Sequence, residues 1–230
     1  MFGMRKHLTA IVMALSLAVG MTAAPTARAS EEQNLVDKAR ITLDDLRRDR
    51  EFGNARDLIK RTKGVMIVPS LVRGGFFFGG EGGEGVLLAR GPGNDWSNPA
   101  FYTLASASFG LQIGLEDQEM VLFLMSERAL NDFMADEFKI GAQAGLAIVT
   151  LGSTAEASTT SNFKADIIIW SSNTGAYAGL TLNGSLIKPR DSWNEVYYGR
   201  PESVRTIITT RSAQNPGTGP LRQELASISR

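Results

Sequence analysis

Glycine dominates one short segment of the chain, because seven of the twelve residues from position 74 to position 85 are glycine. The segment lies between two short apolar runs, residues 65–68 and 86–88, each typical of a buried strand. Glycine inside a strand commonly marks a bulge, a sharp corner or a close approach of another backbone. The segment therefore predicts strands of a strongly bent, tightly packed sheet.

The residues before this segment have a helical period. Over residues 31–50 the apolar side chains recur on one stripe, and Gly53-Asn54 interrupts the pattern before a second short helix that continues to about Lys60. Six to eight strand-like segments follow, with one helix among them and another near residues 201–210. We expect an α+β domain in which amphipathic N-terminal helices pack on a curled, mainly antiparallel sheet that can close toward a barrel.

The first 29 residues have the pattern of a secretory signal peptide. Arg5 and Lys6 precede an apolar run of 13 residues (8–20), and Ala27-Arg28-Ala29 is a small-x-small cleavage site. An uncleaved anchor is the alternative, but it would need roughly 20 apolar residues to span a bilayer. The chain has no cysteine, which excludes a lipidated N-terminus. We expect cleavage after Ala29 and a periplasmic protein that is not a lipoprotein.

The mature chain is long enough for one domain with a sizeable core. We expect this domain over residues 30–210. Residues 214–220 are rich in proline, glycine and polar side chains, and chain ends are commonly poorly ordered. The sequence therefore predicts a flexible C-terminal tail over residues 211–230.

Cleavage also removes His7, the only histidine, so the mature chain has neither histidine nor cysteine. Histidine is the commonest general base and metal ligand near neutral pH. Catalytic triads, Cys–His pairs and zinc or haem sites built on histidine are therefore excluded. The 21 basic and 24 acidic residues that remain do not point to nucleic acid. We expect a protein that is not an enzyme and has no cofactor.

Two carboxylates, Glu81 and Glu84, stand inside the glycine-rich segment. They are candidates for the acid pair of a hydrolase and weak candidates for binding a hard cation. The plainer alternative is a solvated or hydrogen-bonded pair at a strand turn. Residues 80–85 also match G-x-G-x-x-G, but they lead into a strand, whereas dinucleotide binding requires a helix there.

Two features suggest contact with a surface. The aromatic run Phe76-Phe77-Phe78 is either core or an exposed apolar wedge for a membrane or a partner. The N-terminal helices combine an apolar stripe with basic side chains, which acidic residues offset over residues 31–50 but much less over residues 56–63. The candidate lipid-contact residues are Leu35, Lys38, Arg40, Leu43, Arg47, Arg48, Arg56, Lys60, Arg61, Lys63, Phe76, Phe77 and Phe78.

Several segments follow one another in a characteristic order: residues 63–69, 74–90, 96–102, 107–114 and 175–180, then Asn194 with Tyr197-Tyr198-Gly199. Together they resemble the SYLF (Ysc84-like) domain family over about residues 35–210, as a bacterial exported member. The resemblance implies binding of phosphatidylinositol lipids or other lipids, as in eukaryotic members, with an amphipathic N-terminal helix (here residues 35–50) in membrane contact. Yeast members are linked to actin, and bacterial exported members look like lipid-associated proteins.

A periplasmic address removes phosphoinositides and actin as natural ligands. We therefore expect a non-enzymatic, lipid-binding, membrane-peripheral domain of the cell envelope, in contact with phospholipid or a membrane surface and not with nucleic acid. A protein-interaction or scaffold module with an envelope protein partner is the alternative. A carboxylate-based hydrolase is a remote one.

Overall fold

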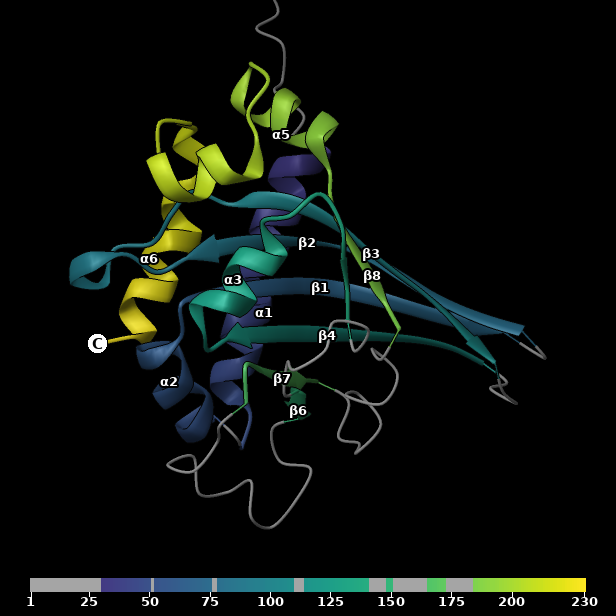
Figure 1. Cartoon of the computed structure of the whole chain (residues 1–230). Coiled ribbons are helices and arrows are strands. Elements are labelled where there is room, and N and C mark those ends of the chain that lie inside the picture. Colours follow the sequence, from purple (N-terminus) through teal and green to yellow (C-terminus); the bar gives the residue numbers. More distant parts are fainter. Residues whose placement is uncertain are drawn as a thin grey trace, which may run out of the picture.

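A computed structural model describes residues 30–50, 52–75, 78–109, 114–140, 148–150, 165–172 and 184–230. Within these residues, a curled sheet has the helices α1 (Glu31–Arg48), α2 (Phe52–Arg61) and α6 (Gly219–Ile228) on one side (Figure 1). Helix α3 (Glu127–Phe133) packs on the other side. The expected α+β class, with N-terminal helices on a sheet, is confirmed.

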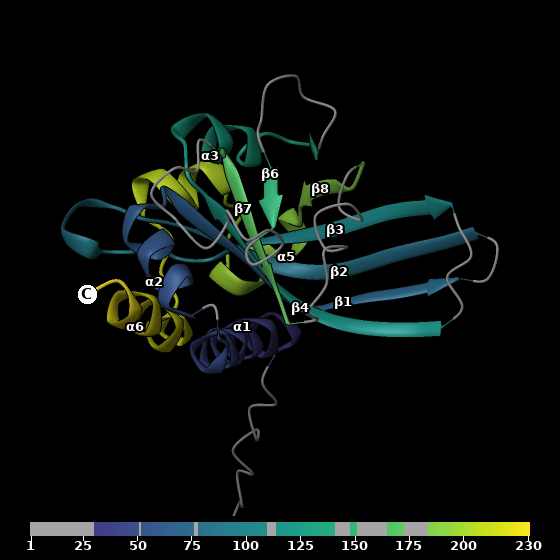
Figure 2. The same ribbon diagram turned by 90° about the horizontal axis from the view of Figure 1, so that it is seen from below.

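The strands form one sheet in the order β5-β8-β3-β2-β1-β4-β7-β6. Every pair in the described part is antiparallel except β6 with β7. The sheet curls into a half-barrel, which confirms the expected architecture (Figure 2). The bounds are β1 (Gly64–Gly75), β2 (Phe78–Ala89), β3 (Ala100–Phe109), β4 (Gly114–Leu124), β5 (Phe138–Lys139), β6 (Ile148–Thr150), β7 (Ile167–Ser171) and β8 (Leu186–Pro189).

Helix α1 forms where its period predicts it. The Ser30 hydroxyl caps it by accepting a hydrogen bond from the Gln33 N–H at 3.2 Å. The helix ends one turn earlier than the expected break, because Asp49 already has extended backbone, and Gly53-Asn54 lies inside α2. The apolar stripe packs on the sheet and is buried at Leu35, Val36, Ala39, Leu43 and Leu46.

Strand β1 supplies side chains to both sides of the sheet. Val65 and Ile67 belong to the core under α1, α2 and α6, whereas Met66 and Val68 belong to the core on the α3 side. This alternation is the period of two that a strand imposes. The sheet therefore has apolar contacts on both faces over the body of the domain.

Pro69 does not end β1, although the sequence predicts a strand that stops there. The strand continues to Gly75, and its pairing with β2 shifts register between Ile67 and Ser70. Proline cannot donate to the ladder, but a bulge leaves one residue unpaired and therefore tolerates it. The bulge makes β1 longer than its apolar run.

The expectation of a flexible tail over residues 211–230 is wrong. This segment contains the 3-10 turn η5 (Pro216–Thr218) and helix α6, which buries Leu221, Leu225 and Ile228 in the same core as α1. The spacing of these three residues is helical. Proline and glycine, which suggested a linker, instead begin η5 and the first turn of α6, where proline is well tolerated.

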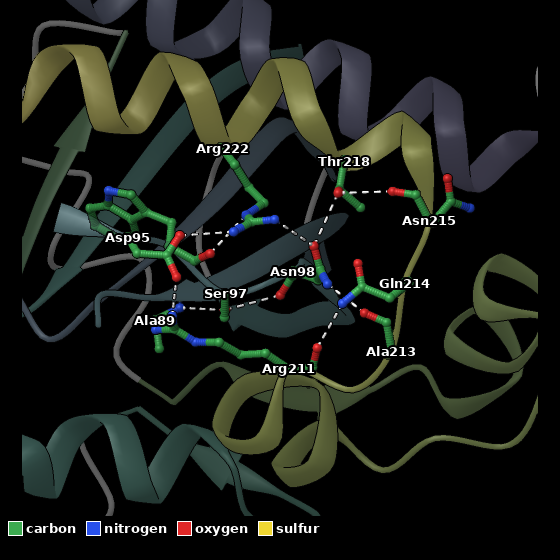
Figure 3. A network of polar contacts seen from close by, with 11 residues as sticks. Ala89, Asp95, Ser97, Asn98, Arg211, Ala213, Gln214, Asn215, Thr218 and Arg222 are labelled. Atoms are coloured by element: carbon green, nitrogen blue, oxygen red, sulfur yellow. Dashed lines mark hydrogen bonds and ion pairs between the residues drawn. The ribbon is translucent and has the colours of Figure 1, made fainter. Parts of the chain in front are cut away.

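Polar contacts also hold this segment to the loop before β3 (Figure 3). The buried Asn98 amide donates to the Ala213 carbonyl oxygen and accepts from the Thr218 hydroxyl at 3.0 Å. Arg222 of α6 donates to the Asp95 carboxylate at 2.8 Å. The C-terminal segment is therefore part of the domain.

No helix in the described ranges is both long enough and apolar enough to cross a membrane. Residues 1–29, the predicted signal peptide, lie outside the described residues.

Candidate functional site

Strands β1 to β4 extend beyond the helices as a four-stranded ribbon, which we call the arm (Figures 1 and 2). The arm consists of residues 71–75, 78–84, 103–109 and 114–118, and its strands are paired along this length. Phe76 and Phe77, the two residues between β1 and β2, lie outside the described residues, and the side chain of Phe78 does too. Both interpretations of the run Phe76-Phe77-Phe78, as core or as an exposed apolar wedge, therefore stay predictions.

One row of the arm is exposed on the α1 side of the sheet. The Cα register places Asp117, Val72, Gly82 and Ala105 side by side across the four strands. Leu71 belongs to the core on the α3 side, so Val72 faces the opposite way, and it is 40% exposed although it is apolar. A row with an exposed valine, a glycine and an alanine is a low surface that another flat surface can approach closely.

The adjacent row faces the α3 side. Leu71 and Leu104 are buried there, and Gly83 lies between them. A Cβ on Gly83 would lie 2.3 Å from the Ser70 carbonyl oxygen at the bulge of β1, whereas a Cβ on Gly82 would meet nothing closer than 3.7 Å. Close backbone approach therefore requires glycine at position 83 but not at position 82.

Helix α5 (Asp191–Tyr198) packs at the root of the arm. Arg190, the residue before it, pairs with Glu84 at 2.9 Å and lies 3.7 Å from the centroid of the Trp193 ring. The Trp193 ring in turn meets Phe101 of β3 edge-on at 6.0 Å. Sequence reasoning missed Arg190 and Trp193, because only the pairing of β8 with β3 brings them to a strand 106 residues earlier.

Glu81 and Glu84 do not form a pair. They are three residues apart in one strand, so their side chains point to opposite faces. Glu81 is buried at 4% exposure, and Glu84 pairs with Arg190. The predictions of a hydrolase pair and of a shared cation site are therefore wrong. Among the described residues, no group of three or more histidine, cysteine or acidic side chains is placed to hold a metal ion.

The apolar stripe of α1 is not available to a membrane. Leu35 is 8% exposed and Leu43 is fully buried, because both pack on the sheet. The prediction that these two side chains contact lipid is therefore wrong. An amphipathic pattern alone does not distinguish a helix that covers a sheet from one that lies on a bilayer.

Most of the basic candidates on α1 have acidic partners, and Lys38 is the exposed one without an ion pair among the described residues. Exposed pairs of this kind contribute little to stability, but they lower the local excess of positive charge. The pairs are Arg40 with Asp44 at 2.9 Å, Arg47 with Glu224 at 2.6 Å and Arg48 with Asp45 at 2.9 Å.

The basic candidates around α2 lie at the opposite end of the sheet from the arm (Figure 2). Arg56 and Arg61 are exposed, Lys60 is half-buried, and Lys63 pairs with Glu127 at 3.1 Å. Lys63 directly precedes β1, so the 12 residues of that strand separate it from the end of the arm, which is roughly 40 Å at 3.3 Å per residue. The structure therefore does not bring the basic candidates and the arm into one surface.

An acidic side chain marks the place where α1 crosses β4. The Thr42 hydroxyl donates to the Glu119 carboxylate at 2.7 Å. Burial raises the pKa of Glu119, the Thr42 hydrogen bond opposes that shift, and the charges of Asp45 and Asp117 add to it. The pKa of Glu119 is therefore higher in the folded than in the unfolded state, so the protonated side chain favours folding. This contribution to stability is present at low pH and is lost as pH rises through the folded-state pKa of Glu119.

Glu119→Gln keeps an oxygen that can accept from Thr42 and removes the charge. We expect a higher melting temperature at pH 7, by a few degrees at most, since about 1 kcal/mol corresponds to ~2–4 °C in a chain of this size. The gain should vanish near pH 4, about the ordinary pKa of glutamate. Thermal unfolding followed by circular dichroism at both pH values measures it. Asp57→Asn on the exposed face of α2 is the control, and a gain that persists at low pH would contradict the expectation.

The fold and the arm define a domain that presents a surface: a helix-covered half-barrel with an exposed ribbon and no paired carboxylates at its glycine-rich segment. The comparison with known families names the class. The chain belongs to the Ysc84 family, whose model, described as "Las17-binding protein actin regulator", matches residues 105–228. The match ends at the last residue of α6, in agreement with the place of that helix in the core. The resemblance to the SYLF (Ysc84-like) family is therefore confirmed, and the family is described by binding rather than by a reaction.

Individual relatives support this assignment. LAS seventeen-binding protein 3 of Saccharomyces cerevisiae is 31% identical over 176 residues, which cover 74% of this chain and 38% of that protein. Protein YSC84 of the same yeast is 31% identical over 175 residues, covering 74% and 37%. SH3 domain-containing YSC84-like protein 1 of Homo sapiens is 29% identical over 161 residues, covering 68% and 47%. The chain thus spans less than half the length of these relatives.

Proposed function

We propose that this chain is a non-enzymatic, membrane-peripheral domain of the cell envelope, which is exported by a cleaved signal peptide and binds phospholipid through the arm. The observation that carries the proposal is the exposed row of Asp117, Val72, Gly82 and Ala105, on a ribbon that extends beyond the helices. A flat row with few large side chains suits a flat partner. Helix α1, the other candidate for membrane contact, has its apolar stripe committed to the core.

The sequence between the two central strands of the arm is aromatic. Phe76 and Phe77 join its two central strands, β1 and β2. Aromatic side chains bury a large apolar area, and their transfer out of water is worth about 1.5–3 kcal/mol each. Export is supported by the basic, apolar and small-residue pattern of residues 1–29. Both features would serve a domain that works at the outer face of a bilayer.

Co-sedimentation of the mature protein with vesicles tests the proposal. We expect binding to vesicles of phosphatidylcholine with one-third phosphatidylglycerol. Phe76→Ser with Phe77→Ser should weaken this binding roughly tenfold or more, because it removes two apolar side chains. Lys38→Glu with Arg56→Glu is the matched charge variant on the helices, and it should leave binding within about twofold at moderate salt.

Two results would count against the arm as the lipid surface. If the charge variant loses binding and the phenylalanine variant keeps it, the helices make the contact. If the mature protein does not sediment with these vesicles, the proposal that it binds phospholipid is overturned. Circular dichroism of both variants shows whether a loss of binding reflects a loss of fold.

A second candidate function is supported by the family description, which names binding of the protein Las17. On this alternative the same exposed row contacts an envelope protein. A photo-crosslinking residue at Ala105 should then give a discrete crosslinked product in envelope extracts, and detergent removal of lipid should leave that product unchanged. The control carries the same photo-crosslinking residue at Gln223, on the exposed side of α6. If both positions give the same diffuse pattern of crosslinked products, the row has no specific protein partner.

A further inference from the structure

A groove of about 680 Å³ lies on a different part of the domain from the arm. It is bounded by the end of α3, by β8, by the start of α5 and by the segment that leads into the π-helical turn η4 (Thr206–Thr210). Its size lies within the roughly 300–1,000 Å³ that is usual for ligand sites. The groove shares no residue with the arm or with the basic candidates of α1 and α2.

The floor of the groove is apolar. Met134 and Val204 line it and are nearly buried, at 9% and 4% exposure, and Pro189 lines it as a half-buried residue. None of the three has a side-chain hydrogen-bond donor, and the Met134 thioether is only a weak acceptor. The floor therefore favours aliphatic or aromatic groups of an occupant.

The rim of the groove is mainly acidic. Asp136, Asp191 and Glu195 are exposed on it, and none of them has an ion pair within the described ranges. Asp191 is explained by its position in the first turn of α5, where a negative charge stabilises the helix. Asp136 and Glu195 have no such structural role.

The other charges of the rim do not balance these carboxylates. Lys188 pairs with Glu137 at 2.7 Å, and Glu202 pairs with Arg200 at 2.6 Å, so each of these pairs is neutral. Arg205 is exposed and is the one cation of the lining without an ion pair in the part of the chain that the structure describes. The groove therefore carries a net negative charge over an apolar floor.

We propose that this groove binds a short, extended, basic segment of a partner protein. Lysine and arginine have long aliphatic stems and charged heads, so a stem can lie on Met134 and Val204 while the head reaches Asp136 or Glu195. The lining of the groove contains no residue of the arm, so this site is separate from the phospholipid contact proposed there. The groove gives the domain a second surface, and the ligand that this surface prefers is positively charged.

Fluorescence polarisation with two labelled peptides of ten residues tests this proposal. One peptide alternates lysine with leucine and alanine, and the other has glutamate in place of each lysine. The mature protein should bind the lysine peptide and not the glutamate peptide. Asp136→Asn with Glu195→Gln should weaken binding roughly five- to tenfold, and raising the salt concentration should weaken binding by the wild type more than by this variant.

Two further variants make the result specific. Arg205→Ala removes the competing cation from the rim and should tighten binding of the lysine peptide. Asp57→Asn removes an exposed carboxylate from α2, away from the groove, and should leave binding unchanged. The proposal is overturned if the two peptides bind alike, or if Asp57→Asn weakens binding as much as the groove variant. Asp136 and Glu195 are exposed, so both changes should leave the fold intact, and vesicle binding by the groove variant should equal that of the wild type.

Discussion

Gly83→Ala is expected to destabilise the domain by about 2–3 kcal/mol, the upper range for forcing extra atoms into a packed site. The added Cβ would lie 2.3 Å from the Ser70 carbonyl oxygen and 3.3 Å from the Leu71 Cα, so the backbone of β1 would have to move. Ile67 and Leu71, on either side of the bulge, are each paired with both β2 and β4, so the backbone between them has little freedom to shift. Chemical denaturation followed by tryptophan fluorescence gives the change in the free energy of unfolding.

Gly82→Ala is the matched control one residue away. Its Cβ would be in ordinary contact, and the residue has no left-handed backbone, so the change should be neutral or slightly stabilising, by less than about 1 kcal/mol. Equal effects at positions 82 and 83 would contradict the bulge that the structure places opposite Gly83.

Deletion of residues 219–230 is expected to abolish cooperative folding. Helix α6 buries Leu221, Leu225 and Ile228, and each is worth about 1.5–3 kcal/mol on burial. Their sum, about 5–9 kcal/mol, is comparable with the whole stability of an ordinary domain, about 5–15 kcal/mol. Thermal unfolding of the truncated and complete mature chains, followed by circular dichroism, measures the effect.

Point variants of α6 separate packing from chain length. Leu225→Ala should cost about 2–5 kcal/mol, whereas Gln223→Ala on the exposed side should cost almost nothing. A truncated chain that unfolds at the melting temperature of the complete one would restore the interpretation of residues 211–230 as a flexible tail.

The fold class could be predicted because its signals are local. The stripe of α1 and the apolar run of β1 each have one period, and both elements form where that period places them. The glycine-rich segment also predicted a close backbone approach. Only the register with β1 shows that this approach occurs at Gly83 and that Ser70 is the neighbour. Composition misled at the C-terminus, since Pro216 and Pro220 begin helical turns there instead of marking a linker.

The surfaces could not be predicted, because they depend on pairings between distant residues. The sequence gives α1 an apolar stripe and basic side chains, but the sheet covers the stripe at Leu43 and an acidic side chain from α6 neutralises Arg47. Glu81 and Glu84 are close in sequence and yet face opposite ways, as soon as the segment is a strand. The groove near Glu195 joins elements from residue 134 to residue 205, and no short motif carries it.

The contact between the first and last helices has a consequence for how the chain matures. Arg47 of α1 meets Glu224 of α6 across 177 positions, and both helices enclose one core. That core closes only after residues 219–228 have been synthesised, because α6 supplies part of it and contacts so distant in sequence form late. On the proposed export route, a chain whose core cannot close early can still pass unfolded through a translocation channel. Helix α6 then completes the core on the far side of the membrane.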